Sequence, residues 1–155
     1  MATLVILRGL PASGKSTWAR KTAATTPNTV VVSLDGLRRM TAGGLAAYHQ
    51  RRTDRMEQLI VRTAHAMVCD ALRKGVNVVM DAQNTTVERV HALVGLAADC
   101  NADVQTVAFP EPLDTLLERN RARAKGKRGR CFRDVRKRWN TAVSDTLKNS
   151  PAGAG

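Results

Sequence analysis

Residues 9–16 of the sequence, GLPASGKS, place two glycines, a lysine and a serine at a spacing that can bind a chain of phosphates. Glycine has no Cβ, so several backbone N–H groups of such a loop can point into one cavity. In this pattern Lys15 reaches the β- and γ-phosphates of ATP, and the Ser16 hydroxyl binds Mg²⁺. The residues expected to bind the phosphate donor are Gly9, Ser13, Gly14, Lys15, Ser16 and Thr17.

Two aspartates follow directly after apolar runs. Asp35 comes just after the run TVVVS, and Asp81 ends the run VNVVMD. A carboxylate beside the γ-phosphate can take the proton of an attacking hydroxyl, and Arg38 shares a face with Asp35 if a helix begins there. Asp81 matches an acid that holds Mg²⁺ through water or through Ser16. Both aspartates could instead be helix caps and Arg38 a surface residue, and the pattern leaves this open.

Short apolar runs alternate with helical patterns along the chain. The runs predict strands at residues 3–8, 29–33, 76–80 and 104–109. The helical spacing predicts helices at 15–24, 53–74, 85–98 and 112–120, and a last helix with apolar residues from 135 to 147. The alternation indicates an α/β fold with a parallel sheet covered on both faces. Such sheets bind ligands at the carboxyl ends of their strands, where the glycine loop, Asp35 and Asp81 all fall.

Local signals add detail to this layout. Thr85 and Glu88 have the spacing of a capping box, which would open the helix that runs to residue 98. Gly43 and Gly44 predict a mobile loop. Residues 150–155 are expected to form a disordered tail, which leaves one domain over residues 1–149.

The charge of the chain is concentrated in one segment. The net charge is +12, and residues 119–138 hold eleven Lys/Arg and one acid, which gives 11 − 1 = +10. A field of one sign attracts polyanions, although a solvated surface helix is the alternative. No apolar run approaches the roughly 18 residues that a membrane span needs, and the N-terminal run is interpreted as a strand.

Other polar and aromatic residues carry no chemical pattern of their own. Three cysteines without a CxxC spacing favour neither a disulfide framework nor a zinc site, and fit thiols in a reducing cytoplasm. The three histidines, at 49, 65 and 91, form no motif. Trp18 and Trp139 are expected in the core or an interface, because 3% aromatic residues disfavour binding by base stacking.

Four stretches, in order along nearly the whole chain, resemble the bacteriophage-type polynucleotide 5′-kinases. They are GLPASGKSTWAR from Gly9, the pair Asp35-x-x-Arg38, DAQNTTVER from Asp81, and Arg119-Asn120-x-x-Arg123. Many families share the glycine loop, whereas the two arginine patterns are more specific. The resemblance implies a P-loop NTPase fold of the adenylate-kinase-like type. This is a three-layer αβα sandwich with about four parallel strands and an arginine-rich lid at about residues 121–133.

The resemblance also implies an activity, transfer of the ATP γ-phosphate to the 5′-hydroxyl of DNA or RNA in nucleic-acid repair. Asp35 would be the general base, Arg38 would hold the phosphate beside the acceptor nucleoside, and Arg123, supported by Arg119, would clamp the donor phosphates. The lid sequence AKGKRGRCFR leaves open which arginine faces ATP. A 3′-phosphatase motif DxDxT is absent from this sequence, so kinase activity alone is expected, in a bacterial or phage-infected cytoplasm. The implied catalytic residues are Lys15, Asp35, Arg38 and Arg123.

Two other functions fit part of the sequence. A small-molecule or toxin-type P-loop kinase would share the glycine loop but would not need the basic segment. A non-enzymatic module that senses nucleotide and docks on nucleic acid would not need Asp35 together with Arg38.

Overall fold

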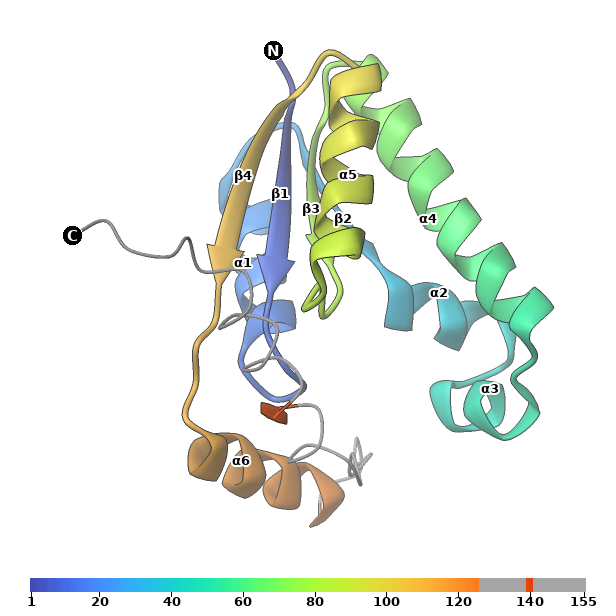
Figure 1. Cartoon of the computed structure of the whole chain (residues 1–155), viewed down its shortest axis with the longest axis vertical. Coiled ribbons are helices and arrows are strands. Elements are labelled where there is room, and N and C mark those ends of the chain that lie inside the picture. The colour runs from blue at the N-terminus through green and yellow to red at the C-terminus, as the bar shows by residue number, and fades with distance from the viewer. Residues whose placement is uncertain (126–138, 141–155) are drawn as a thin grey trace.

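A parallel four-stranded sheet forms the centre of the protein in the computed structural model, which describes residues 1–125 and 139–140 (Figure 1). The strands lie in the order β2-β3-β1-β4. Their bounds are Thr3–Arg8 for β1, Thr29–Ser33 for β2, Asn77–Asp81 for β3 and Asp103–Ala108 for β4. Every neighbouring pair is parallel, so all four carboxyl ends lie at one edge of the sheet.

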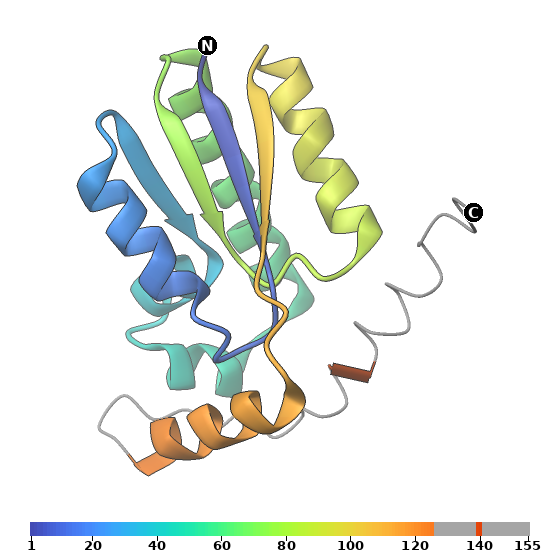
Figure 2. The same ribbon diagram turned by 90° about the vertical axis from the view of Figure 1, so that its left-hand side faces the viewer.

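Helices cover both faces of this sheet (Figure 2). Helix α1 (Lys15–Thr25) lies on one face, and α4 (Asp54–Arg73) and α5 (Val87–Asp99) lie on the other. The side chains of the central strands alternate accordingly, because successive residues of a strand point to opposite faces. Leu4 and Ile6 join the large core beneath α4 and α5, whereas Leu7 packs with Ala19 on the α1 side. The predicted α/β sandwich with a parallel sheet is therefore confirmed.

The glycine pair expected in a mobile loop lies in a short turn between two helices. These helices, α2 (Leu34–Thr41) and α3 (Leu45–Arg51), lie below the carboxyl ends of the strands (Figure 1). The hydroxyl of Ser33 accepts a hydrogen bond of 3.2 Å from Gly36 N and so caps α2. Gly43 and Gly44 have φ of +71° and +145°, and these left-handed conformations end one helix and allow the next to begin.

Two helix boundaries also differ from the sequence-based expectation. The capping box at Thr85 is wrong, because the cap of α5 is Thr86, whose hydroxyl accepts from Arg89 N at 3.4 Å. Glu88 is therefore the second residue of the helix and not the third. Helix α6 (Leu113–Lys125) runs further than residue 120 and crosses beneath the sheet edge (Figure 2).

Tryptophan and cysteine side chains pack as parts of the core. The Trp18 and Phe109 rings meet edge to face with centroids 6.2 Å apart, and Trp139 packs against Leu10 and Leu116, so the expected structural role of both tryptophans is confirmed. Cys69 and Cys100 are free thiols with their Sγ atoms 3.1 Å apart, and burial raises the pKa of Cys69.

The rest of the expected last helix, Cys131, and the tail at 150–155 lie outside the described residues. Among the described helices, none is both long enough and apolar enough to cross a membrane.

Candidate active site

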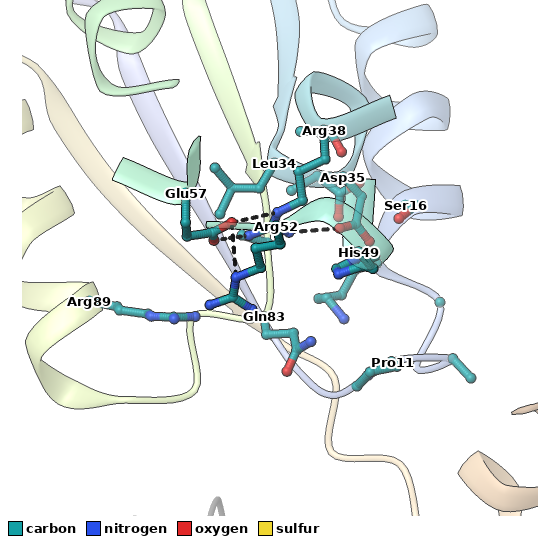
Figure 3. Close-up of a pocket in the computed structure, with 16 residues that line it drawn as sticks. Pro11, Ser16, Leu34, Asp35, Arg38, His49, Arg52, Glu57, Gln83 and Arg89 are labelled. Carbon is teal, nitrogen blue, oxygen red and sulfur yellow. Dashed lines mark hydrogen bonds and ion pairs between the residues drawn. The ribbon is translucent and has the colours of Figure 1, made fainter. Parts of the chain in front are cut away.

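A pocket of about 360 Å³ opens at the carboxyl edge of the sheet (Figure 3). The glycine loop forms one side of it, and residues from α2, α3, α4 and the start of α5 form the other. The predicted residues that line it are Gly14, Lys15, Ser16, Asp35, Arg38 and Asp81. Parallel strands bring these segments together because their carboxyl ends share one edge.

The glycine loop is held in a compact conformation above β1. A Cβ on Gly9 would lie 2.8 Å from Ser13 Oγ and 3.0 Å from Phe109 Cβ, so a larger residue would displace the loop. Gly14 has φ of +98°, a conformation that glycine adopts without strain. Lys15 opens α1, and its Nζ donates hydrogen bonds to Leu10 O at 2.7 Å and to Ser13 Oγ at 3.3 Å. The loop therefore places an ammonium group and a helix N-terminus together, an arrangement suited to phosphate.

The turn after β3 is fastened to the same loop. Gly9 N donates to Gln83 O at 3.0 Å, and the buried Asn84 side chain donates to Leu7 O at 2.9 Å. These bonds fix the position of Asp81, which is 9% exposed and lines the pocket that Ser16 also lines.

Magnesium fits the two oxygen ligands, Ser16 and Asp81, on the wall nearest the glycine loop. Mg²⁺ prefers oxygen, and it is usually held by one or two protein groups together with substrate phosphates and water. Ser16 and Asp81 supply a hydroxyl and a carboxylate within one pocket. The part of the chain that the structure describes contains no cluster of three or more carboxylate, histidine or cysteine ligands. The site therefore suits a metal that is shared with bound phosphates.

Arg38 lies between two carboxylates on the opposite wall. Its Nη1 donates to Asp35 Oδ1 at 2.7 Å, and its Nε donates to Glu57 Oε2 at 3.2 Å, while Nη2 also bonds to Glu57. The Tyr48 hydroxyl donates to Glu57 Oε2 at 2.6 Å, and Tyr48 itself is fully buried. The helix that begins at Leu34 thus brings Asp35 and Arg38 together, as their spacing predicts.

These contacts change the protonation equilibria of the group. Burial disfavours the charge of Arg38, but the hydrogen bonds and charges of Glu57 and Asp35 outweigh burial and raise its pKa. Burial likewise favours neutral Glu57, but Arg38, Tyr48 and Arg52 outweigh it and hold the Glu57 pKa below its usual range. The pKa of Tyr48 is raised by burial and by its bond to Glu57. Arg38 and Glu57 therefore form a charged pair around neutral pH.

Several pocket residues were not predicted from the sequence. The pocket is also lined by Glu57, His49, Arg52 and Arg89. The sequence assigns no role to the first three, and Arg89 enters only through the resemblance. Arg38 and Glu57 are 19 residues apart in the sequence. Tyr48 of α3 also contacts Glu57, and the glycine pattern did not predict this helix. An acid one turn into a long helix carries no sequence signal of its own.

Glu57→Gln should lower the free energy of unfolding by about 2 kcal/mol at neutral pH, the scale of a hydrogen bond to a charged group. Because folding lowers the Glu57 pKa, its stabilisation is complete above the unfolded pKa of about 4.3 and is lost as pH falls through the folded value. Urea unfolding of parent and variant at pH 7, pH 5 and below pH 4 measures this difference. Glu118→Gln, exposed in the middle of α6, is the control. A difference that persists unchanged in acid would contradict the role of the carboxylate charge.

Helix α6 approaches the glycine loop through Arg119. Its Nη1 donates to Ala12 O at 3.4 Å and lies 3.5 Å from Glu111 Oε1. The role of Arg119 at the donor phosphates, which the resemblance implies, stays a prediction. Arg123 lies in the last turn of α6, and its side chain and most of the expected lid at 121–133 are outside the described part of the chain.

Comparison with known proteins places this pocket among P-loop domains. A protein-family model described as an AAA domain matches residues 4–149. L-seryl-tRNA(Sec) kinase of Methanococcus maripaludis is 24% identical over 142 residues, which cover 89% of this chain and 52% of that protein. This chain therefore spans about half the length of that curated relative.

Solved structures give the same picture of the fold. A chain of the Pnkp1/Rnl/Hen1 RNA repair complex is 26% identical with a TM-score of 0.83, covering 96% of this chain and 46% of that one. Kti12 of Chaetomium thermophilum in complex with ADP-AlF3 is 20% identical with a TM-score of 0.65, covering 92% of this chain and 79% of that one. The second likeness shows the fold alone.

Proposed function

Because the chain belongs to the family of AAA domains and has the fold of a P-loop kinase, we propose that it transfers the γ-phosphate of ATP to the 5′-hydroxyl of a DNA or RNA end. The observation that carries this proposal is the Asp35–Arg38 pair, bonded at 2.7 Å, in the pocket that Lys15 and Ser16 line. A purely nucleotide-sensing site would not need a base together with a cation on the wall that faces the phosphates.

The proposed reaction follows from this arrangement. ATP would bind with its phosphates in the glycine loop, where Lys15 would neutralise charge on the γ-phosphate. Ser16 and Asp81 would hold Mg²⁺, which would supply further charge stabilisation. Asp35 accepts the proton of the 5′-hydroxyl as its oxygen bonds to the γ-phosphorus. The bond from the γ-phosphorus to the β–γ bridging oxygen breaks, and ADP leaves. Arg123 would clamp the donor phosphates from α6, with Arg119 as support.

Arg38 is proposed to hold the phosphate on the 3′ side of the acceptor nucleoside. Glu57 binds two of its nitrogens and Asp35 binds a third, so the guanidinium is oriented before the acceptor arrives. Pre-orientation of a charged group lowers the entropic cost of placing the substrate for attack. Asp35 and the acceptor phosphate would then share one fixed arginine.

A nucleic-acid acceptor is favoured by two further observations. Residues 119–138 carry a charge of +10, which suits a polyanion. One similar structure belongs to an RNA repair complex, and we place the activity in nucleic-acid repair, in a bacterial or phage-infected cytoplasm. The alternative is a different hydroxyl acceptor, such as a tRNA-linked serine, which the similarity to L-seryl-tRNA(Sec) kinase favours. A small metabolite is a third class of acceptor.

One labelling experiment separates these acceptors. The protein is incubated with Mg²⁺ and ATP labelled in the γ-phosphate, together with 5′-OH DNA, 5′-OH RNA, seryl-tRNA or a metabolite panel. We expect label at the 5′ ends of DNA or RNA. Label found only on the tRNA-linked serine or on a metabolite would refute the proposed acceptor, and an absence of label in every reaction would refute the enzyme.

Acceptor affinity should also depend strongly on salt and on the 3′-phosphate. Each phosphate contact releases counterions, so the KM for a 5′-OH oligonucleotide should rise about tenfold or more between low and moderate ionic strength. A 5′-OH nucleoside that lacks the 3′-phosphate should be a poor acceptor at every salt concentration, because Arg38 would have nothing to hold. Steady-state labelling across a salt series measures both effects. A flat series would mean that the basic segment faces solvent and not the acceptor.

A further inference from the structure

Arginines continue along the pocket wall beyond Arg38. Arg52 and Arg89 line the same pocket, at the end of α3 and in the first turn of α5. In Figure 3 the glycine loop, marked by Pro11, lies on one side and Arg89 on the other, with Arg52 between them and close to Glu57. The pocket therefore extends from the glycine loop, past Asp35 and Arg38, to the guanidinium groups of Arg52 and Arg89.

The protein only partly neutralises the positive charges of Arg52 and Arg89. Arg52 lies 4.0 Å from Glu57 Oε2, but that carboxylate already binds Arg38 and Tyr48. Within the described part of the chain, no carboxylate is within ion-pair distance of the Arg89 guanidinium. Both side chains are exposed where they line the pocket, so their positive charges would attract an anion there.

The position of Arg89 is also unfavourable for the helix that carries it. It is the third residue of α5, and the N-terminal turn of a helix disfavours positive charge. Arg89 thus neither stabilises its helix nor forms a described ion pair, yet it lines the pocket. A bound ligand would account for this position. Guanidinium groups bind phosphate with two parallel hydrogen bonds, so phosphate is the matching chemistry.

We propose that Arg52 and Arg89 form a second phosphate subsite, which takes the phosphodiester that follows the one held by Arg38. This inference rests on the proposed function and extends it: an acceptor with at least two phosphates is preferred to a nucleoside with one. The 5′-hydroxyl lies at Asp35, the first phosphate at Arg38, and the second phosphate between Arg52 and Arg89. The enzyme is thereby selective for chains.

Three acceptors isolate the second phosphate. Thymidine 3′-phosphate has one phosphate, the dinucleotide TpT adds a nucleoside, and TpTp adds the second phosphate, with ribose versions tested alongside. We expect the parent KM for TpTp to be at least about tenfold lower than that for TpT, the effect of one charge-assisted pair. The double variant Arg52→Gln/Arg89→Gln should reduce this ratio to about one or two. Lysine at both positions should leave an intermediate ratio, because charge remains but the paired bonds are lost.

Two further variants make the outcome decisive. Arg73→Gln removes an exposed arginine at the far end of α4 and should leave the ratio unchanged. Arg89→Gln alone breaks no described ion pair, so it tests the subsite even if the double variant folds poorly, and should lower the ratio at least about threefold.

The outcomes that overturn the proposal differ from failure of the proposed function. A parent ratio near one, or a ratio unchanged in the Arg89 variant, would show that the kinase acts on 5′ ends but has no second subsite. If none of the three acceptors and no longer oligonucleotide is labelled, the proposed function is wrong, and the subsite is rejected with it.

Discussion

Lys15→Ala should lower the rate of phosphate transfer by about 10³-fold, the upper range for removing one group that stabilises transition-state charge. Lys15 is 7% exposed and is held inside the glycine loop by bonds to Leu10 O and Ser13 Oγ. Its ammonium group is therefore fixed where the β- and γ-phosphates would lie, and alanine leaves no cation in the loop to replace it. The rate is measured with saturating 5′-OH oligonucleotide and labelled ATP.

Two further variants are compared with Lys15→Ala. Lys21→Ala removes an exposed lysine from the same helix and should retain the parental rate. Ser16→Ala removes the hydroxyl proposed to bind Mg²⁺, and its loss of rate should be partly relieved by raising the Mg²⁺ concentration. Turnover near the parental rate in Lys15→Ala would exclude the glycine loop from the mechanism.

Asp35→Asn should lower transfer by at least about 10²-fold while ATP binding stays close to parental, because this is the usual scale for loss of a general base. Asparagine keeps the size of aspartate, and its Oδ1 can still accept the bond from Arg38, which Glu57 also holds. The acceptor arginine should therefore stay in place, and only the capacity to take a proton is lost. Single-turnover labelling with excess enzyme measures the chemical step.

ATP affinity, measured by equilibrium titration, separates lost chemistry from lost binding in this variant. Ser33 caps α2 through its own hydroxyl, so the helix does not need the Asp35 carboxylate to begin. If Asp35→Asn phosphorylates 5′ ends at the parental rate, then Asp35 only orients Arg38, and another group must accept the proton.

The sequence predicts the phosphate-donor half of this pocket well because that half is local. The glycine loop, the strand before it and the helix after it are contiguous, and both β1 and β2 have the predicted bounds. Short β-branched runs between turns define such buried strands with little dependence on distant contacts. Asp35 and Asp81 could be placed by the same rule, since Asp81 ends β3 and Asp35 lies two residues after β2. Arg38 follows from its spacing of three residues to Asp35 in α2.

The acceptor half could not be predicted in the same way. Tyr48 lies in α3, Glu57 in α4, and Arg52 between these two helices, and they meet only because α2 and α3 fold back beneath the sheet edge. Gly43 and Gly44 predict a mobile loop, but in the structure they form the turn between α2 and α3, with positive φ angles. The misplaced cap of α5 has a different origin. Thr85 has the capping-box spacing to Glu88, but a threonine hydroxyl can cap a helix without that box, and the fold selects Thr86.

The two halves of the pocket come from different parts of the chain, and this has an evolutionary consequence. In the proposed function one continuous loop and helix would bind ATP, whereas α2, α3, α4 and the start of α5 would contribute the residues around the acceptor. Substitutions in the second group can alter which molecule is phosphorylated without disturbing how ATP is held. Acceptor preference is thus free to diverge between descendants of one ancestral domain, while dependence on ATP is inherited unchanged.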